Sequence, residues 1–401
     1  NQTTYMMRNI LHLVIVILLI IGCNTDKNDD EINTFEILTF DKHELTINPS
    51  SPYQTMFINA TGKFKIKVEG VKDNDRWLYY TLSENELTIN ALSNNDEVVK
   101  SALIIIYNEE NAISDTLKIT QPIYEERIAL IKFYKALNGD EWTKNENRCS
   151  DKPISEWYGI RAINDAFVSS IWLPGDAYIE GELPSCITSL KNLRELCFEG
   201  TRMSGKLPSN IGDLTKLQHI AIKNCNFSGT IPESLKNCKE LEIVDLSHNN
   251  FSDAIPEFFF QLPRLHSIEL NHNKFESFSM NSNPIEGDLV YMSIDNNEIS
   301  SSIPENIFKI KTMQFIYAND NKISGTIPAS IGDSRNLMIL RLENNNITGK
   351  LPESMVNLQL LNDFSITNNY IDVNNTDYLK SNSNYSNWRF GNQNNNIKPN
   401  N

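Results

Sequence analysis

The sequence predicts an α+β multidomain protein, in which a small all-β sandwich precedes a right-handed solenoid with a parallel concave sheet. At 401 residues the chain is long enough for two or three domains. Apolar and polar residues alternate through much of 35–121, as in strands with one buried face. Farther along, apolar residues recur every 24 positions, at Leu193, Leu217, Leu241, Leu265, Leu289, Met313, Leu337 and Leu361. A fixed period of this length is typical of stacked repeats.

The N-terminal residues have the pattern of a targeting segment. An apolar run from Ile10 to Ile21 follows Arg8, and about a dozen such residues suit a signal peptide, whereas a membrane span needs roughly 20. The run ends at Gly22 and Cys23, an ending that resembles a bacterial lipobox. The resemblance implies a signal peptide at 1–22 and acylation of Cys23. An ordinary signal peptide with an incidental cysteine is the alternative.

Residues 23–34 are rich in Asp and Glu and lack the apolar residues of a packed domain, which indicates an acidic tether. Acidic residues directly after an acylated cysteine also resemble the signal that places lipoproteins on the outer face of some Gram-negative bacteria. The resemblance implies an outer membrane lipoprotein exposed at the cell surface. The inner face of that membrane is the alternative.

Residues 35–121 are expected to form the sandwich. Phe64, Ile66 and Val68 alternate with polar residues, and turn-rich stretches separate such runs. The segment 62–68, the strand at Trp77, the run 102–107 and the ending 117–121 resemble a BACON-type module. That resemblance implies an immunoglobulin-like fold and contact with glycans, or a spacer that lifts the next domain off the membrane.

Residues 122–165 are expected to be a helical cap for the solenoid. Leu130, Tyr134 and Leu137 lie on one face of a helix that begins near Glu125 and ends at Asn138 and Gly139. The first coil of a solenoid exposes apolar surface unless another segment covers it. The order helix, Trp142, Cys149, Trp157 resembles the N-terminal cap of plant-type leucine-rich-repeat proteins.

Residues 166–373 are expected to form about nine coils of 24 residues. Eight positions after each recurring leucine the later coils carry Asn, at Asn249, Asn273, Asn297, Asn321, Asn345 and Asn369, whereas Thr201 and Cys225 hold this place earlier. An amide can donate to and accept from backbone that turns after its strand. We therefore expect a structural Asn ladder, held less tightly in the first coils.

The segments 204–208, 228–232, 324–328 and 348–352 share the pattern Ser/Thr-Gly-x-Ile/Leu-Pro. With the period, this pattern is similar to that of plant-type leucine-rich repeats, and the resemblance covers about 122–395. Asp253 and Ser301 replace the glycine, and the fifth coil loses the pattern at 276–284, where a bulge is expected. Residues 374–401 are expected to be a C-terminal cap and tail, with Trp388 and Phe390 covering the last coil.

Side chains two and four positions after the recurring leucine point away from the core of such a coil. Apolar residues gather there in three successive coils, and aromatic residues beside an arginine on a rigid sheet have the composition of an interaction hot spot. The hypothesised partner-binding residues are Tyr291, Phe315, Tyr317, Ile339 and Arg341. The alternative is that these residues simply suit exposed strands.

Other reactive side chains carry weaker signals. Asp245 and Glu269, like His248 and His272, lie one coil apart, but no third ligand has suitable spacing, so no metal site is predicted. Five cysteines follow Cys23, an odd number, which leaves at least one unpaired. A bridge between Cys149 and Cys186 would tie the cap to the first coil.

Composition narrows the function. The formal charge of −15 argues against nucleic acid, which needs clustered Lys and Arg. No nucleophile elbow, zinc helix or phosphate loop occurs in the sequence, so we expect no enzyme and no cofactor. We expect a monomeric, lipid-anchored protein that binds an extracellular protein or peptide through its concave face. The alternative is a glycan-binding lipoprotein of a polysaccharide-utilisation or adhesion system.

Overall fold

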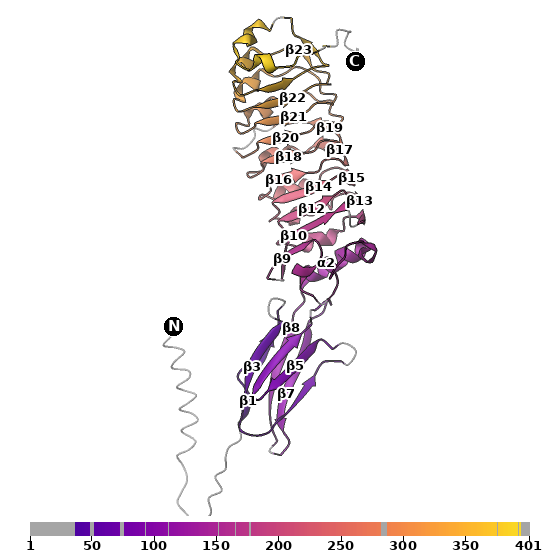
Figure 1. Cartoon of the computed structure of the whole chain (residues 1–401), viewed down its shortest axis with the longest axis vertical. Coiled ribbons are helices and arrows are strands. Elements are labelled where there is room, and N and C mark those ends of the chain that lie inside the picture. Colours follow the sequence, from indigo (N-terminus) through magenta and orange to yellow (C-terminus); the bar gives the residue numbers. More distant parts are fainter. Residues whose placement is uncertain are drawn as a thin grey trace, which may run out of the picture.

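The computed structural model describes residues 37–393, apart from 49–51, 73–75, 93, 111, 151, 165, 176–177, 282–286, 375 and 392. The expected signal peptide, the tether and Cys23 lie outside the described residues. A β-domain at one end is followed by a long stack of coils (Figure 1). Among the described residues, no helix combines the length and apolar character that crossing a bilayer requires.

The N-terminal β-domain consists of two four-stranded sheets, in the orders β1-β3-β6-β5 and β2-β8-β7-β4. Its strands are β1 (Leu38–Phe40), β2 (Glu44–Thr46), β3 (Tyr53–Ala60), β4 (Lys65–Glu69), β5 (Leu78–Ser83), β6 (Glu86–Ala91), β7 (Lys100–Asn108) and β8 (Ile113–Gln121). Alternate residues of these strands, such as Leu87 and Ile89, form a separate apolar core. Neighbouring strands pair antiparallel with one exception, because β2 pairs with β8 in parallel.

The cap contains the helix α2 (Glu125–Ala136), the 3-10 turns η1 (Gly139–Glu141) and η2 (Ile154–Glu156), and the strand β9 (Ile160–Ile163). After the helix, Asn138 adopts a left-handed backbone with φ of 49°, which Asn tolerates better than most residues. Phe133 on α2 stacks on Phe198 of the solenoid at 6.3 Å between ring centroids. The cap and the coils thereby share one continuous apolar core.

The predicted parallel sheet is confirmed. Ten strands lie side by side, and only β9 pairs antiparallel to its neighbour β10. The others are β10 (Phe167–Pro174), β12 (Glu195–Glu199), β14 (His219–Lys223), β16 (Ile243–Asp245), β18 (Ser267–Glu269), β20 (Tyr291–Ser293), β21 (Phe315–Tyr317), β22 (Ile339–Arg341) and β24 (Asp363–Ser365). Each residue pairs with the one a repeat later, as Phe315 does with Ile339.

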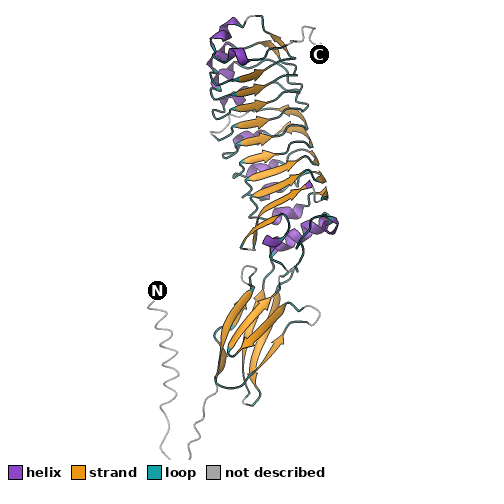
Figure 2. Cartoon of the chain, in the orientation of Figure 1, coloured by secondary structure: helices purple, strands orange, loops and turns teal. Residues whose placement is uncertain are grey.

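A second parallel sheet, which the sequence did not lead us to expect, follows the first around each early coil (Figure 2). It contains β11 (Glu180–Glu182), β13 (Arg202–Gly205), β15 (Asn226–Gly229), β17 (Asn250–Ile255) and β19 (Lys274–Phe278), and β23 (Thr348–Lys350) pairs with β25 (Tyr370–Asp372) later. Gly205 has φ of +82°, and a Cβ there would lie 2.8 Å from Glu182. The glycine of the Ser/Thr-Gly-x-Ile/Leu-Pro pattern therefore permits close stacking of these strands.

The coil that loses this pattern is locally irregular. Asp253 takes the glycine position and has φ of 66°. It pairs with Phe275, whereas Ala254 pairs with Ser277, so the register shifts at Glu276. Residues 282–284 of the segment where a bulge is expected lie outside the described part of the chain.

Short 3-10 helices close the coils. They are η4 (Ser185–Ser189), η5 (Ile211–Asp213), η6 (Glu233–Asn237), η7 (Glu257–Gln261), η8 (Glu305–Lys309), η9 (Ala329–Asp333), η10 (Glu353–Asn357), η11 (Asp377–Ser381) and η12 (Tyr385–Asn387). Proline precedes several of them, as Pro232 precedes η6. Proline suits this position because the first turn of a helix leaves backbone N–H groups without intrahelical partners.

A ladder of buried amides joins successive coils. Asn297 is typical: its Oδ1 accepts from the Phe275 N–H at 3.0 Å, and its Nδ2 donates to the Leu270 and Ile294 carbonyls at 3.0 and 3.1 Å. Cys225 occupies an earlier rung and offers only its thiol, 3.3 Å from the Lys223 carbonyl and 3.8 Å from that of Phe198.

The ladder continues beyond the expected end of the repeats at residue 373. Gln393 accepts from the Ile371 N–H at 3.1 Å and donates to the Ile366 carbonyl at 3.1 Å, the pattern that Asn369 makes one coil earlier. Trp388 is buried, and its indole N–H donates to the Leu361 carbonyl. The segment expected to be the C-terminal cap thus continues the hydrogen-bond pattern of the coils as far as Gln393.

Candidate functional site

The candidate site is the outer side of the ten-stranded sheet, which we call the sheet face: the outward-pointing side chains of β10 to β24. The central strands are three residues long, so each buries its middle residue. On β21 the middle residue Ile316 is buried, whereas Phe315 and Tyr317 on either side are partly exposed. The alternation along each strand thus determines which side chains are exposed and able to contact a partner.

Three aromatic side chains of the sheet face form what we call the aromatic cluster: Tyr291, Phe315 and Tyr317. The Tyr291 ring lies 6.2 Å from that of Phe315 and 5.6 Å from that of Tyr317, measured between centroids. Ile339 continues the row, because β22 pairs with β21 in register. Four of the five hypothesised binding residues therefore form one partly exposed apolar surface.

Arg341, the fifth, lies beside this surface, but its charge is already paired. Its Nε donates to Asp363 at 3.1 Å, and its Nη1 donates to Glu343 at 3.4 Å. Burial lowers the pKa of the guanidinium, but hydrogen bonds and charge from Asp363 and Glu343 outweigh burial and raise it. Asp363 also accepts from Arg389 at 2.6 Å. Arg341 thus belongs to an ion-pair network at the edge of the aromatic cluster.

Two carboxylates stand on the other side of the cluster. Asp245 on β16 pairs in register with Glu269 on β18, so two like charges lie on neighbouring strands. Asp245 is only 8% exposed, and its Oδ1 accepts from the backbone N–H and hydroxyl of Ser247. Burial, and then the charge of Asp245, raise the pKa of Glu269. In the described part of the chain neither carboxylate has a Lys or Arg ion-pair partner.

Trp172 is a candidate binding residue that we did not select from the sequence. It is 55% exposed on β10 and pairs in register with Cys197. Exposed tryptophan is the residue type most often found at binding hot spots. The sequence carried this signal. Val168 corresponds to the recurring leucines of the later coils, and Trp172 stands four positions after it, where side chains point outward. The first coil is one residue longer than the others, which disguised this alignment.

His248 and His272 lie in the turns after their strands. Both have a left-handed backbone, with φ of 53° and 54°, and their rings stack at 4.1 Å with an interplanar angle of 17°. Nearly parallel rings direct their nitrogen lone pairs side by side, not toward a common ion. No group of three metal-ligating side chains occurs among the residues that the structure describes.

The bridge considered between Cys149 and Cys186 is absent, because both are free thiols. The Cys186 sulfur instead lies 3.7 Å from the Ala129 carbonyl of α2. Packing of the helix against η4, rather than a covalent link, therefore connects the cap to the first coils. Burial raises the pKa of both thiols, which disfavours the reactive thiolate.

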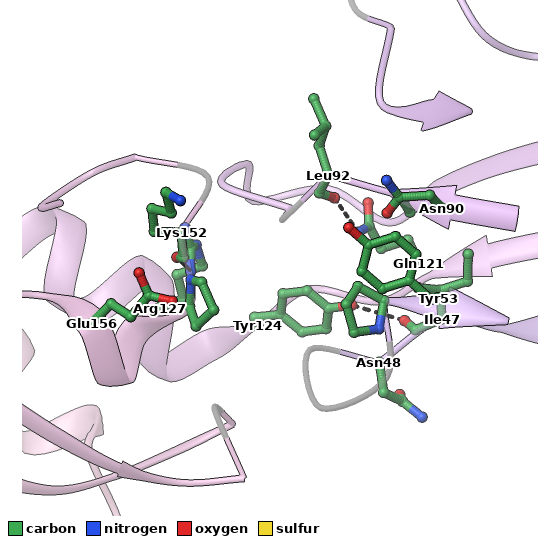
Figure 3. Close-up of a pocket in the computed structure, with 13 residues that line it drawn as sticks. Ile47, Asn48, Tyr53, Asn90, Leu92, Gln121, Tyr124, Arg127, Lys152 and Glu156 are labelled. Carbon is green, nitrogen blue, oxygen red and sulfur yellow. Dashed lines mark hydrogen bonds between the residues drawn. The ribbon is translucent and has the colours of Figure 1, made fainter. Parts of the chain in front are cut away.

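A cavity of about 270 Å³ lies where the β-domain meets the cap (Figure 3). The Tyr124 hydroxyl crosses this junction and donates to the Ile47 carbonyl at 2.8 Å. Gln121 is buried and donates to the Leu92 carbonyl, while its Oε1 has no protein partner. We assign this cavity no ligand.

Comparisons with known proteins agree with the repeat. Residues 215–275 and 336–358 match the leucine rich repeat family, so the chain contains leucine-rich repeats. No curated protein matches the chain.

Among solved structures, the plant peptide hormone receptor RGFR1 in complex with RGF2 is 29% identical over 48% of this chain and 31% of its own, with a TM-score of 0.45. A plant ice-binding protein is 20% identical over 62% and 87%, with a TM-score of 0.49. The Arabidopsis receptor kinase HAESA with the peptide hormone IDA and SERK1 is 22% identical over 62% and 50%, with a TM-score of 0.40. The chain spans about a third of the length of RGFR1, the first of these structures.

Proposed function

We propose that this protein is a cell-surface, lipid-anchored binding protein, without catalytic activity, that recognises a protein or peptide through the sheet face. The aromatic cluster carries the proposal. Tyr291, Phe315 and Tyr317 are in contact on adjacent strands of a rigid sheet, and their side chains stay partly exposed where a partner could cover them. Such a surface requires little ordering on binding, so more of the contact free energy appears as affinity.

The test is selection from a random peptide library on the immobilised chain. Peptides with a reproducible pattern should emerge, and Phe315→Ser with Tyr317→Ser should weaken their binding at least about tenfold, the loss of one hot-spot contact. Phe57→Ser is the control, because Phe57 is 58% exposed on the β-domain. Unchanged affinity in the double variant, with an unchanged melting temperature, would contradict the proposal.

A second candidate function is glycan binding by the β-domain, and one row of side chains favours it. Tyr53 on β3, Asn90 on β6 and Tyr79 on β5 pair in register across three strands. Tyr53 is 65% and Tyr79 39% exposed. Two aromatic faces beside an amide can stack on sugar rings and hydrogen-bond to their hydroxyls.

A glycan array probed with the chain and with Tyr53→Ala, Tyr79→Ala distinguishes the two functions. Signals that vanish in this double variant but persist in Phe315→Ser, Tyr317→Ser support the glycan function. An array on which the chain binds no glycan would contradict the glycan function.

The anchor has its own test. We propose that Cys23 is acylated, and growth of a bacterial host with radiolabelled fatty acid should label the wild-type chain. Cys23→Ser should abolish the label, whereas label retained by that variant would contradict the anchor.

A further inference from the structure

The sheet face carries exposed apolar side chains toward both of its ends. Trp172, on the first long strand β10, is 55% exposed and lies apart from the aromatic cluster on β20 and β21. Six strand steps separate β10 from β21, which at about 4.8 Å per step is about 29 Å. An extended chain of about nine residues covers that distance. One extended peptide could therefore reach both ends.

The surface between the two ends is acidic. Five outward side chains on or next to the intervening strands are carboxylates: Glu195, Glu199, Asp245, Glu269 and Asp295. Lys223 is the lysine on these strands. Its Nζ is 3.3 Å from Glu199, and its charge also attracts Asp245 and Glu269. Glu195 lies 4.0 Å from Arg161, an exposed side chain of β9. The local charge therefore remains negative after these pairs are counted.

The Asp245–Glu269 pair places two like charges on neighbouring strands, and Lys223 offsets only part of their repulsion. Like charges opposite each other on neighbouring strands destabilise a sheet. Partial burial strengthens the repulsion, because the effective dielectric constant is lower there than in water. A cation placed between the two carboxylates would relieve it, so a bound cation would be favoured by both attraction and relief of repulsion.

We infer that the sheet face binds an extended, basic peptide segment, with one apolar side chain on Trp172, another on the aromatic cluster, and Lys or Arg over Asp245 and Glu269. The inference rests on the proposed function, because it names the chemistry of the peptide that the face recognises. The carboxylates also disfavour phosphorylated or sulfated ligands, whose charge has the same sign.

The experiment uses the peptide selection described above, with about 12 randomised residues, enough to span both ends. The selected peptides should be enriched in Lys and Arg between two apolar positions. Glu269→Gln should weaken their binding about tenfold at low salt and less at high salt. Glu305→Gln is the matched control, since Glu305 is an exposed carboxylate on η8, away from the sheet face. Trp172→Ala should weaken the same peptides.

The outcomes separate the two proposals. Selected peptides that lose binding in Phe315→Ser, Tyr317→Ser but are neutral or acidic would overturn this inference and leave the proposed function in place. Basic peptides bound equally by wild type and Glu269→Gln would also overturn it. Failure to select any peptide sensitive to Phe315→Ser, Tyr317→Ser would overturn both. A melting temperature of Glu269→Gln at or above that of wild type excludes misfolding as the cause of weaker binding.

Discussion

At the scale of single residues, each Asn of the ladder stabilises the solenoid through several hydrogen bonds in a dry interior. Asn297 accepts one backbone N–H and donates to three carbonyls, those of Leu270, Ile294 and Asp295. A buried polar group left without a partner costs about 1–3 kcal/mol. The amide therefore stabilises the solenoid mainly by giving buried backbone groups a hydrogen-bond partner.

Asn297→Ala should lower the free energy of unfolding by about 1–3 kcal/mol, because the buried Phe275 N–H loses its acceptor. The carbonyls that Asn297 contacts keep other donors, as Leu270 keeps Asn273. Urea denaturation followed by circular dichroism measures the change. Asn226→Ala, at an exposed position of β15, should change stability by less than about 0.5 kcal/mol. Equal effects of the two substitutions would show that a buried Asn of the ladder adds no more to stability than an exposed Asn does.

Cys225→Asn should raise the free energy of unfolding by about 1 kcal/mol, the net value of a typical added hydrogen bond. The new amide would face the Phe198 carbonyl and the Met203 N–H, whose present contact with Thr201 is 3.4 Å long. Val244→Asn introduces the same group into the apolar interior and should be destabilising. Chemical denaturation of both variants checks the opposite signs, and a shared sign would contradict this explanation.

At the scale of the element, strands of three residues fix the direction of each side chain, while lateral register fixes its neighbours. Register places Phe315 beside Tyr291, which is favourable, and Asp245 beside Glu269, which is not. The sheet can hold an unfavourable pair because the apolar interior of the coils determines the register. Outward positions are therefore free to serve binding at a small cost in stability.

Glu269→Gln should stabilise the free protein at pH 7 by a few tenths to about 1 kcal/mol, since one of two opposed charges is removed. The folded pKa of Glu269 is raised above the ordinary 4.5. Its contribution to stability is therefore fully present below that value and is lost as the pH rises through the folded pKa. The difference between the variant and wild type should shrink toward pH 4, and thermal melts across this range measure it. A variant less stable at pH 7 would contradict the predicted repulsion.

At the scale of the whole molecule, two apolar cores meet at a polar junction. Arg127 on α2 is 5% exposed and stacks at 4.8 Å over Trp157 of the cap. Its Nε donates to Asn95 of the β-domain, and its Nη1 donates to the Lys152 carbonyl at 3.1 Å. One guanidinium therefore connects the β-domain, the helix and the loop before η2.

Arg127→Ala should loosen this junction and lower the stability of the cap by about 2–3 kcal/mol, because the Ser150 carbonyl loses its donor and the Trp157 ring loses its stacked guanidinium. Hydrogen exchange should accelerate in 122–157, and small-angle scattering should report a wider range of end-to-end distances. Lys132→Ala is the control, since its ion pair with Glu97 crosses the same junction but is exposed and should contribute little. Unchanged exchange in Arg127→Ala would contradict this role of the guanidinium.

The sequence by itself determined the period of the coils, the buried and outward position of each strand residue, and the amide rungs. These features are local: a fixed number of residues closes each coil, and alternation in a strand sets which side chains are buried. Phe315 and Tyr317 could be assigned to the outer face for this reason. Trp172 could have been assigned in the same way, once the extra residue of its coil was taken into account.

Only the tertiary structure decided which side chains touch. The pairing of Arg341 with Asp363, the free state of Cys149 and Cys186, and the stacking of His248 on His272 depend on distances between coils and on side-chain rotamers. The second sheet and the continuation of the hydrogen-bond pattern to Gln393 also required the stack itself. Such contacts form between segments that the chain brings together from a repeat or more apart, so no local pattern specifies them.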